Sequence, residues 1–76
     1  MLDAADIRRR IQAALPEAVV EVRATTGGGD HFEARVIAAA FAGKSRIEQH
    51  QLVYAPLRDL LASGALHALA LKTEVP

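Results

Sequence analysis

The sequence predicts a small α+β fold, in which a three-stranded mixed sheet is covered on one face by helices. Two runs, 18–25 and 31–39, alternate apolar and polar residues as half-buried strands do, and a third apolar run follows at 66–73. Segments with apolar residues at helical spacing precede the first run and separate the second from the third. The predicted order is therefore α-β-β-α-α-β, with the helices packed against the sheet.

Length and composition allow one compact core. The chain has 76 residues, 51% of them hydrophobic, and a chain this short buries only about 60% of its unfolded surface. We therefore expect a single domain over 1–76. Every apolar run needs a common surface to pack on, and the predicted core consists of Phe32, Val36, Leu57, Leu60, Leu61, Leu69 and Leu71.

Charge and cysteine content exclude or disfavour several classes of function. Nine basic residues balance nine acidic residues, which leaves no net field to attract nucleic acid or an anionic membrane. The absence of cysteine excludes a disulfide scaffold, an all-protein iron-sulfur site and a thiol nucleophile, and it fits a reducing compartment. The chain begins without the apolar core of a signal peptide and has no run of membrane-spanning length, so we expect a soluble cytoplasmic protein.

The first helix and the strand pair are bounded by specific residues. Asp3 can cap a helix in which Ile7 and Ile11 recur at helical spacing. Pro16 ends this segment. Between the two strands, Gly27-Gly28-Gly29-Asp30 predicts a flexible turn, so the strands form an antiparallel hairpin.

Two short helices are expected between the hairpin and the last strand. Ser45 and Glu48 form a capping box for a helix that runs through Tyr54. Pro56 suits the first position of the next helix, and Gly64 ends it. This connection allows the last strand to lie parallel to a hairpin strand, which gives a mixed sheet and a topology shared with type II KH-like domains.

The last strand carries a histidine near its start. On a pleated strand His67 shares one face with Leu69 and Leu71, so parity places it among the core-facing residues, although its position at the strand's beginning lets it reach the rim. From the residues alone, two interpretations stay open. His67 is either a half-buried histidine with satisfied hydrogen bonds or a metal ligand.

Four blocks of the sequence, spread over almost the whole chain, are similar to a known family in their order and spacing. They are His31-Phe32, Phe41-Ala42-Gly43-Lys44-Ser45-Arg46, His50 with Leu52-Val53-Tyr54, and Leu66-His67-Ala68-Leu69-Ala70-Leu71-Lys72-Thr73. Together they resemble the BolA family. Members typically carry Arg-His-Arg where this chain has Gln49-His50-Gln51, so the chain looks closest to the acid-stress, IbaG-like branch.

The resemblance implies a non-enzymatic protein that partners a monothiol glutaredoxin as a heterodimer. The pair would share a 2Fe-2S cluster, together with glutathione, and act in iron-sulfur cluster trafficking or iron homeostasis. No cofactor is expected in the isolated protein, which would be a monomer or a weak homodimer. The sequence contains no catalytic triad, metal cage or nucleophile motif, which agrees with the absence of catalysis that the resemblance implies.

The same resemblance orders the candidate ligands. A chain with no thiolate cannot hold a 2Fe-2S cluster alone, but imidazole nitrogen is a competent iron ligand and can complete a cluster whose other ligands come from a partner. His67 is the first candidate and His31, at the mouth of the glycine-rich turn, is the second. His50 lies inside a helix, where a packing or surface role is expected.

A nucleic-acid-binding transcriptional regulator is the alternative function. It is suggested by the KH-like topology and by the basic turn Gly43-Lys44-Ser45-Arg46, so its candidate contacts are Lys44, Arg46 and His50. A KH domain clamps the nucleic-acid backbone with a G-x-x-G loop, and here the second glycine is Arg46. With zero net charge, at most weak nucleic-acid binding is expected.

Overall fold

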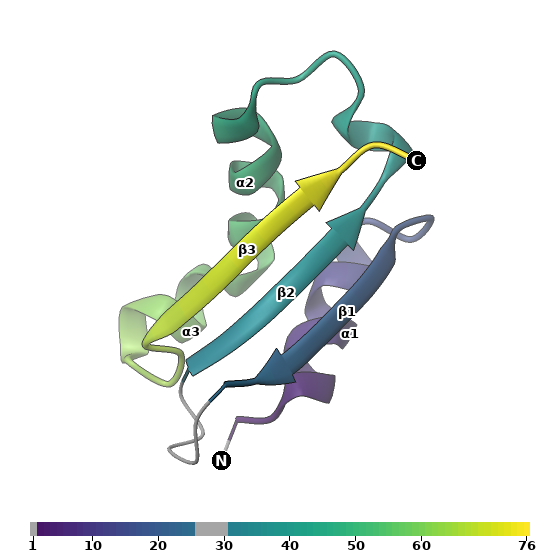
Figure 1. The fold of residues 1–76 in the computed structure, drawn as a ribbon. Coiled ribbons are helices and arrows are strands. Elements are labelled where there is room, and N and C mark those ends of the chain that lie inside the picture. Colours follow the sequence, from purple (N-terminus) through teal and green to yellow (C-terminus); the bar gives the residue numbers. More distant parts are fainter. Residues whose placement is uncertain (1, 26–30) are drawn as a thin grey trace.

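The predicted layers are present, with one sheet and all the helices behind one of its faces (Figure 1). The computed structural model describes residues 2–25 and 31–76, and the glycine-rich turn predicted at 27–30 lies outside them. The order α-β-β-α-α-β is confirmed, with two single-turn 3₁₀ helices added. The elements are α1 (Ala4–Ala14), β1 (Val19–Ala24), β2 (His31–Ile37), η1 (Ala39–Phe41), α2 (Arg46–Tyr54), η2 (Ala55–Leu57), α3 (Arg58–Ser63) and β3 (Ala68–Glu74).

The sheet has the order β1-β2-β3 and is mixed, as predicted. β1 pairs antiparallel to β2, with Val20 opposite Val36, and β3 pairs parallel to β2, with Phe32 opposite Leu69. A parallel pair needs a crossover connection, which α2 and α3 supply on the helix side of the sheet (Figure 1). The starts of β2 and β3 therefore meet at one end of the sheet.

Side-chain caps fix the ends of the helices. The Asp6 backbone N–H donates to the Asp3 carboxylate at 2.9 Å, and the Glu48 N–H donates to Ser45 Oγ at 3.2 Å. The Ser45 N–H donates back to the Glu48 carboxylate, which lowers the pKa of Glu48 below its usual range. α3 ends at Gly64, whose φ of 81° is left-handed and suits glycine. The predicted caps are confirmed.

The core lies between the sheet and the helices, and most of its predicted members are confirmed. Its largest fully buried side chains include five residues absent from the predicted core, namely Ile7, Ile11, Phe41, Val53 and Leu66. Three of the predicted members are buried, namely Phe32, Val36 and Leu57. Three others are partly buried and pack against the core, namely Leu60, Leu69 and Leu71. In the described ranges, no helix is long and apolar enough to cross a membrane.

Leu61 was wrongly predicted as a core residue. It is 36% exposed, whereas Leu60 packs against the core. The reason is the geometry of α3, in which successive residues are rotated by about 100° around the helix axis. Leu60 is turned toward the core, so its neighbour Leu61 is turned toward solvent.

Candidate metal-ligating histidines

The parallel pairing of β2 and β3 brings the two predicted ligands together. His31 is the first residue of β2 and lies opposite Ala68, the first residue of β3, so His67 stands one residue before that pair. The ring centroids of His31 and His67 are 6.2 Å apart, and the ring planes are inclined by 55°. Both residues are exposed. Two histidines far apart in the sequence thus form one exposed pair at one end of the sheet.

The prediction that His67 faces the core is wrong. β3 begins at Ala68, so strand parity does not extend to His67, and the residue that enters the core is its neighbour Leu66, which is 1% exposed. The Leu66 N–H donates to the Leu60 carbonyl at 3.1 Å, which turns the chain back after α3. This turn buries Leu66 and directs His67 to the surface.

A compact turn between α3 and β3 positions His67. The Ser63 hydroxyl donates to the Leu60 carbonyl at 3.2 Å and accepts the Ala65 N–H at 3.3 Å. Gly64 turns the chain through its left-handed φ, and a Cβ placed on it would lie 3.9 Å from Nε2 of His67. The imidazole therefore sits beside the glycine that ends the helix, and the ring's place depends on this turn.

The histidine pair offers up to two nitrogen ligands. Across 2–25 and 31–76, no three side chains of the metal-binding types cluster closely enough to hold an ion. Structural metal sites and iron-sulfur clusters take four protein or protein-like ligands, so two imidazoles do not complete one. Their exposure at the end of the sheet suits a site whose remaining ligands come from a second molecule.

His50 belongs to a different part of the structure. It is half-buried in α2, and its ring meets that of Tyr54 edge to face, with centroids 6.3 Å apart. The Tyr54 hydroxyl donates to the Leu69 carbonyl at 3.5 Å, which ties α2 to β3. His50 therefore packs along the helix that covers the last strand.

The basic turn of the alternative function lies away from the histidine pair. Lys44, in the connection from η1 to α2, and Arg46, the first residue of α2, are both exposed. This connection lies at the end of the sheet where β2 and β3 finish (Figure 1). His31 and His67 stand where those strands begin. The structure thus separates the two sets of predicted site residues.

Gln49 holds this basic turn in place. Its Nε2 donates to the carbonyls of Phe41 at 3.2 Å and Lys44 at 3.1 Å, and its Oε1 accepts a hydrogen bond of 2.6 Å from Thr73 Oγ1. In the sequence, Gln49 stood out only because members of the resembling family typically carry arginine at this position. Its structural role depends on the approach of β3 to α2, which no local pattern reveals.

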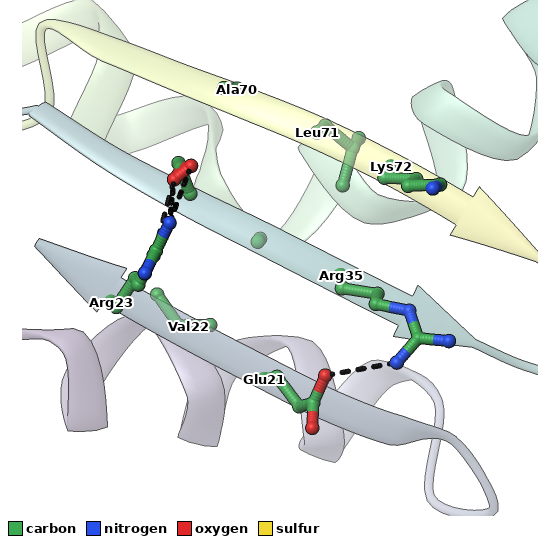
Figure 2. A pocket seen from close by; sticks show the side chains of 9 residues that line it. Glu21, Val22, Arg23, Arg35, Ala70, Leu71 and Lys72 are labelled. Atoms are coloured by element: carbon green, nitrogen blue, oxygen red, sulfur yellow. Dashed lines mark hydrogen bonds and ion pairs between the residues drawn. The ribbon is translucent and has the colours of Figure 1, made fainter. Parts of the chain in front are cut away.

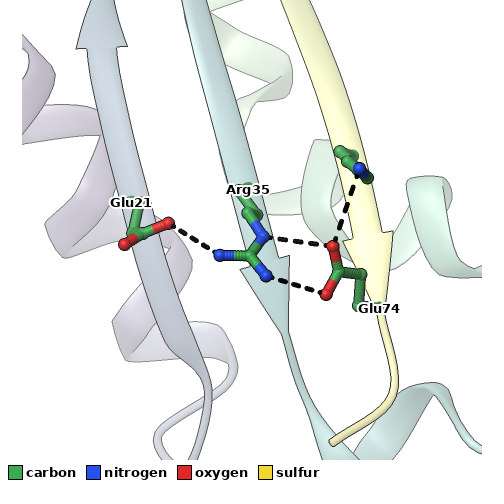
Figure 3. Close-up of polar contacts among 4 residues, drawn as sticks. Glu21, Arg35 and Glu74 are labelled. Carbon is green, nitrogen blue, oxygen red and sulfur yellow. Dashed lines mark hydrogen bonds and ion pairs between the residues drawn. The ribbon is translucent and has the colours of Figure 1, made fainter.

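The open face of the sheet carries paired charges. Arg35 bridges all three strands: it binds Glu74 at 3.0 and 3.1 Å and Glu21 at 3.3 Å (Figure 3). These bonds, the Glu74 bond foremost, raise the pKa of Arg35, and the Arg35 bond lowers the pKa of the Glu74 carboxyl. A second pair, Arg23 with Glu33 at 2.8 Å, lies on the other side of a shallow groove (Figure 2).

These features define a small α+β domain that presents two histidines at one end of a mixed sheet. Residues 11–76 match the family model described as BolA-like protein. The chain belongs to the BolA-like family, which confirms the resemblance found in its sequence.

Two curated relatives show the extent of the similarity. BolA-like protein 1 of Bos taurus is 37% identical over 79 residues, which cover 95% of this chain and 58% of the relative. Acid stress protein IbaG of Escherichia coli strain K12 is 35% identical over 51 residues, which cover 67% of this chain and 61% of IbaG. The chain thus spans less than two thirds of the length of these relatives.

Solved structures agree with the fold. BolA1 of Mus musculus has a TM-score of 0.81 at 32% identity, covering 96% of this chain and 64% of the other. A bolA homologue from Coxiella burnetii has a TM-score of 0.80 at 38% identity, and the match covers 100% of this chain and 94% of the homologue. The BolA domain of SufE1 from Arabidopsis thaliana has a TM-score of 0.81 at 35% identity, and the match covers 96% of this chain and 91% of that domain's chain.

Proposed function

We propose that this protein is a non-enzymatic partner of a monothiol glutaredoxin and that the two share a 2Fe-2S cluster, in iron-sulfur trafficking or iron homeostasis. His67 and His31 would be the ligands contributed by this chain. The observation that carries the proposal is the exposed pair of imidazoles 6.2 Å apart at one end of the sheet. Membership of the BolA-like family supports it.

The chemistry of the donor set fits a shared site. The chain has no cysteine, and its histidine pair supplies at most two of the four ligands that a 2Fe-2S cluster takes from outside its own sulfides. A glutaredoxin cysteine and glutathione would supply thiolates for the other positions. Imidazole in place of thiolate raises the reduction potential of such a cluster and makes its ligation sensitive to protons.

The turn that carries His67 suits ligation. The residue lies outside β3 on a hydrogen-bonded turn, and its neighbour Leu66 anchors that turn in the core. A ligand on a rigid support loses little conformational freedom when it binds. The exposed ring is therefore held on a supported turn, where a ligand set supplied by a second molecule could reach it.

The proposal is tested by mixing the purified protein with a cluster-loaded monothiol glutaredoxin. We expect a heterodimer in native mass spectrometry and a change in visible circular dichroism when the protein is added. The same experiment with apo-glutaredoxin shows whether the two proteins form a heterodimer without the cluster. An unchanged cluster spectrum, or no complex at all, contradicts the proposal.

A nucleic-acid-binding regulator is the second candidate, and the exposure of Lys44 and Arg46 favours it. Against it, several other basic side chains are engaged in ion pairs, among them Arg10, Arg23 and Arg35. We expect duplex DNA to bind no tighter than about 10⁻⁴ to 10⁻⁶ M at physiological salt, without sequence preference. Sub-micromolar, sequence-dependent binding in a mobility-shift titration, lost in Lys44→Ala, would favour this candidate instead.

A further inference from the structure

The outer edge of β3 has a sequence that is complementary to itself. The sheet order is β1-β2-β3, so within the described sheet β3 has a neighbouring strand on one side. An edge strand presents backbone N–H and C=O groups to any chain that can pair with it. Here the edge runs through Leu71-Lys72-Thr73-Glu74-Val75, in which the residues on either side of Thr73 have opposite charges and those beyond them are apolar.

Two hydrogen bonds of β3 establish which of its residues direct their backbone groups outward. The Ala38 N–H donates to the Glu74 carbonyl at 3.1 Å, so the backbone of Glu74 points toward β2. Backbone direction alternates along a strand, so Leu71 and Thr73 direct their N–H and C=O groups to the outer edge. The Leu69 carbonyl fits this alternation, because it accepts a hydrogen bond from the Tyr54 hydroxyl of α2.

We propose that two copies of this chain pair through β3, antiparallel and with the twofold axis at Thr73. Outward-facing residues in such a pairing exchange both backbone hydrogen bonds, so Thr73 bonds Thr73 of the second copy and Leu71 bonds Val75 of the second copy. Lys72 then lies opposite Glu74 of the second copy in a close pair without backbone bonds, and it does so twice by symmetry. The two sheets join into one of six strands.

The side chains favour this register. Lys72 is 75% exposed and lies 3.9 Å from its own Glu74, so it can turn to Glu74 of the second copy at little cost. Val75 is 49% exposed and would be covered by Leu71 of the second copy. A shift by two residues places Lys72 opposite Lys72 or Pro76 of the second copy and loses both ion pairs.

The pairing is independent of the proposed cluster site. It uses residues 71–75 at the end of β3, whereas His31 and His67 stand at its beginning. α2 packs on the helix side of β3, where Gln49 accepts a hydrogen bond from Thr73 Oγ1, so the Thr73 side chain is engaged away from the edge. An edge pairing of five residues is far smaller than a standard interface, so the dimer should be weak.

Sedimentation equilibrium of the full chain from about 10 µM to about 1 mM tests the proposal. We expect a reversible monomer–dimer equilibrium. Lys72→Glu places carboxylates opposite one another and should raise the dimer dissociation constant at least about tenfold. The exchange Lys72→Glu with Glu74→Lys restores opposite charges and should bring the constant back to within about threefold. Arg23→Glu makes the same charge change on β1, at a side chain 79% exposed, and should have no effect.

A second measurement identifies the register. In a mixture of isotopically labelled and unlabelled protein, the proposed pairing predicts an intermolecular contact between the Hα atoms of Lys72 and Glu74. The amide of Thr73 should also gain protection from hydrogen exchange as the protein concentration rises. A protein that stays monomeric at every concentration, or a dimer insensitive to Lys72→Glu and lacking this contact, would overturn the proposal.

Discussion

His31 and His67 form their pair only because β3 lies parallel to β2 in one particular register. The residue after His67, Ala68, lies opposite His31, and the two imidazole centroids are 6.2 Å apart. Neither residue is close to the other in the sequence. The candidate site is therefore a product of the crossover through α2 and α3, and its integrity follows the integrity of the sheet.

Replacement of Leu66 tests how the turn after α3 is anchored. Leu66→Ala should destabilise the protein by about 2–5 kcal/mol, because the side chain is 1% exposed and leaves a cavity in the core. Leu69→Ala should cost less, since Leu69 packs only at the core's margin. Leu61→Ala is the matched control and should be close to neutral. Urea unfolding measures all three, and an equal cost for Leu66 and Leu61 would contradict the assigned core.

Much of the fold could be predicted from the sequence, because the signals that define its elements are local. Alternation marked the strands, and Asp3, Ser45 and Gly64 marked helix ends. The side of the molecule on which His67 lies could not be predicted, because it depends on where β3 begins. β3 begins two residues later than the predicted run, so His67 lies outside the strand and does not follow its alternation between core and surface.

The candidate site could also be predicted only in part from the sequence. Histidine as a residue type was visible in the sequence, and so was the resemblance that singled out His67 and His31. Their proximity was not visible, since it requires the register between β2 and β3. The anchor formed by Gln49 and Thr73 was missed for the same reason, because its two members come together only in the tertiary structure.

Replacement of Gln49 tests that anchor. Gln49→Ala removes the hydrogen bonds to the carbonyls of Phe41 and Lys44 and the bond from Thr73, so we expect a loss of about 1–2 kcal/mol of stability. The Lys44 amide, which donates to the Phe41 carbonyl, should exchange faster. Gln51→Ala, at an exposed position of the same helix, is the control. Equal exchange of the Lys44 amide in both variants would show that Gln49 does not hold the turn.

The ion pair between Arg10 and Asp59 predicts a pH dependence. Arg10 donates to the Asp59 carboxylate at 2.7 Å, and this bond lowers the pKa of Asp59. A carboxyl whose pKa is lower in the folded state contributes stability above the ordinary carboxylate pKa of about 4, and that contribution is lost as the pH falls further.

Substitution of Asp59 makes this pH dependence measurable. Asp59→Asn should lower the free energy of unfolding slightly at neutral pH. It should also make the loss of stability below about pH 4 less steep. Glu17→Gln, at an exposed position, is the matched carboxylate-to-amide control. Chemical unfolding at a series of pH values measures the effect. An acid decline that is equally steep in Asp59→Asn and in the unsubstituted protein would contradict the role of the pair.

The visible circular dichroism of the cluster-bridged complex with glutaredoxin, recorded for His67→Ala, tests the central claim most directly. We expect a changed cluster spectrum and an unchanged unfolding midpoint, because His67 is exposed on its turn. His31→Ala should give a smaller change, and His50→Ala, which alters a ring packed against Tyr54, should give none. A His67→Ala complex that still contains glutaredoxin and has the unaltered spectrum would contradict ligation by His67.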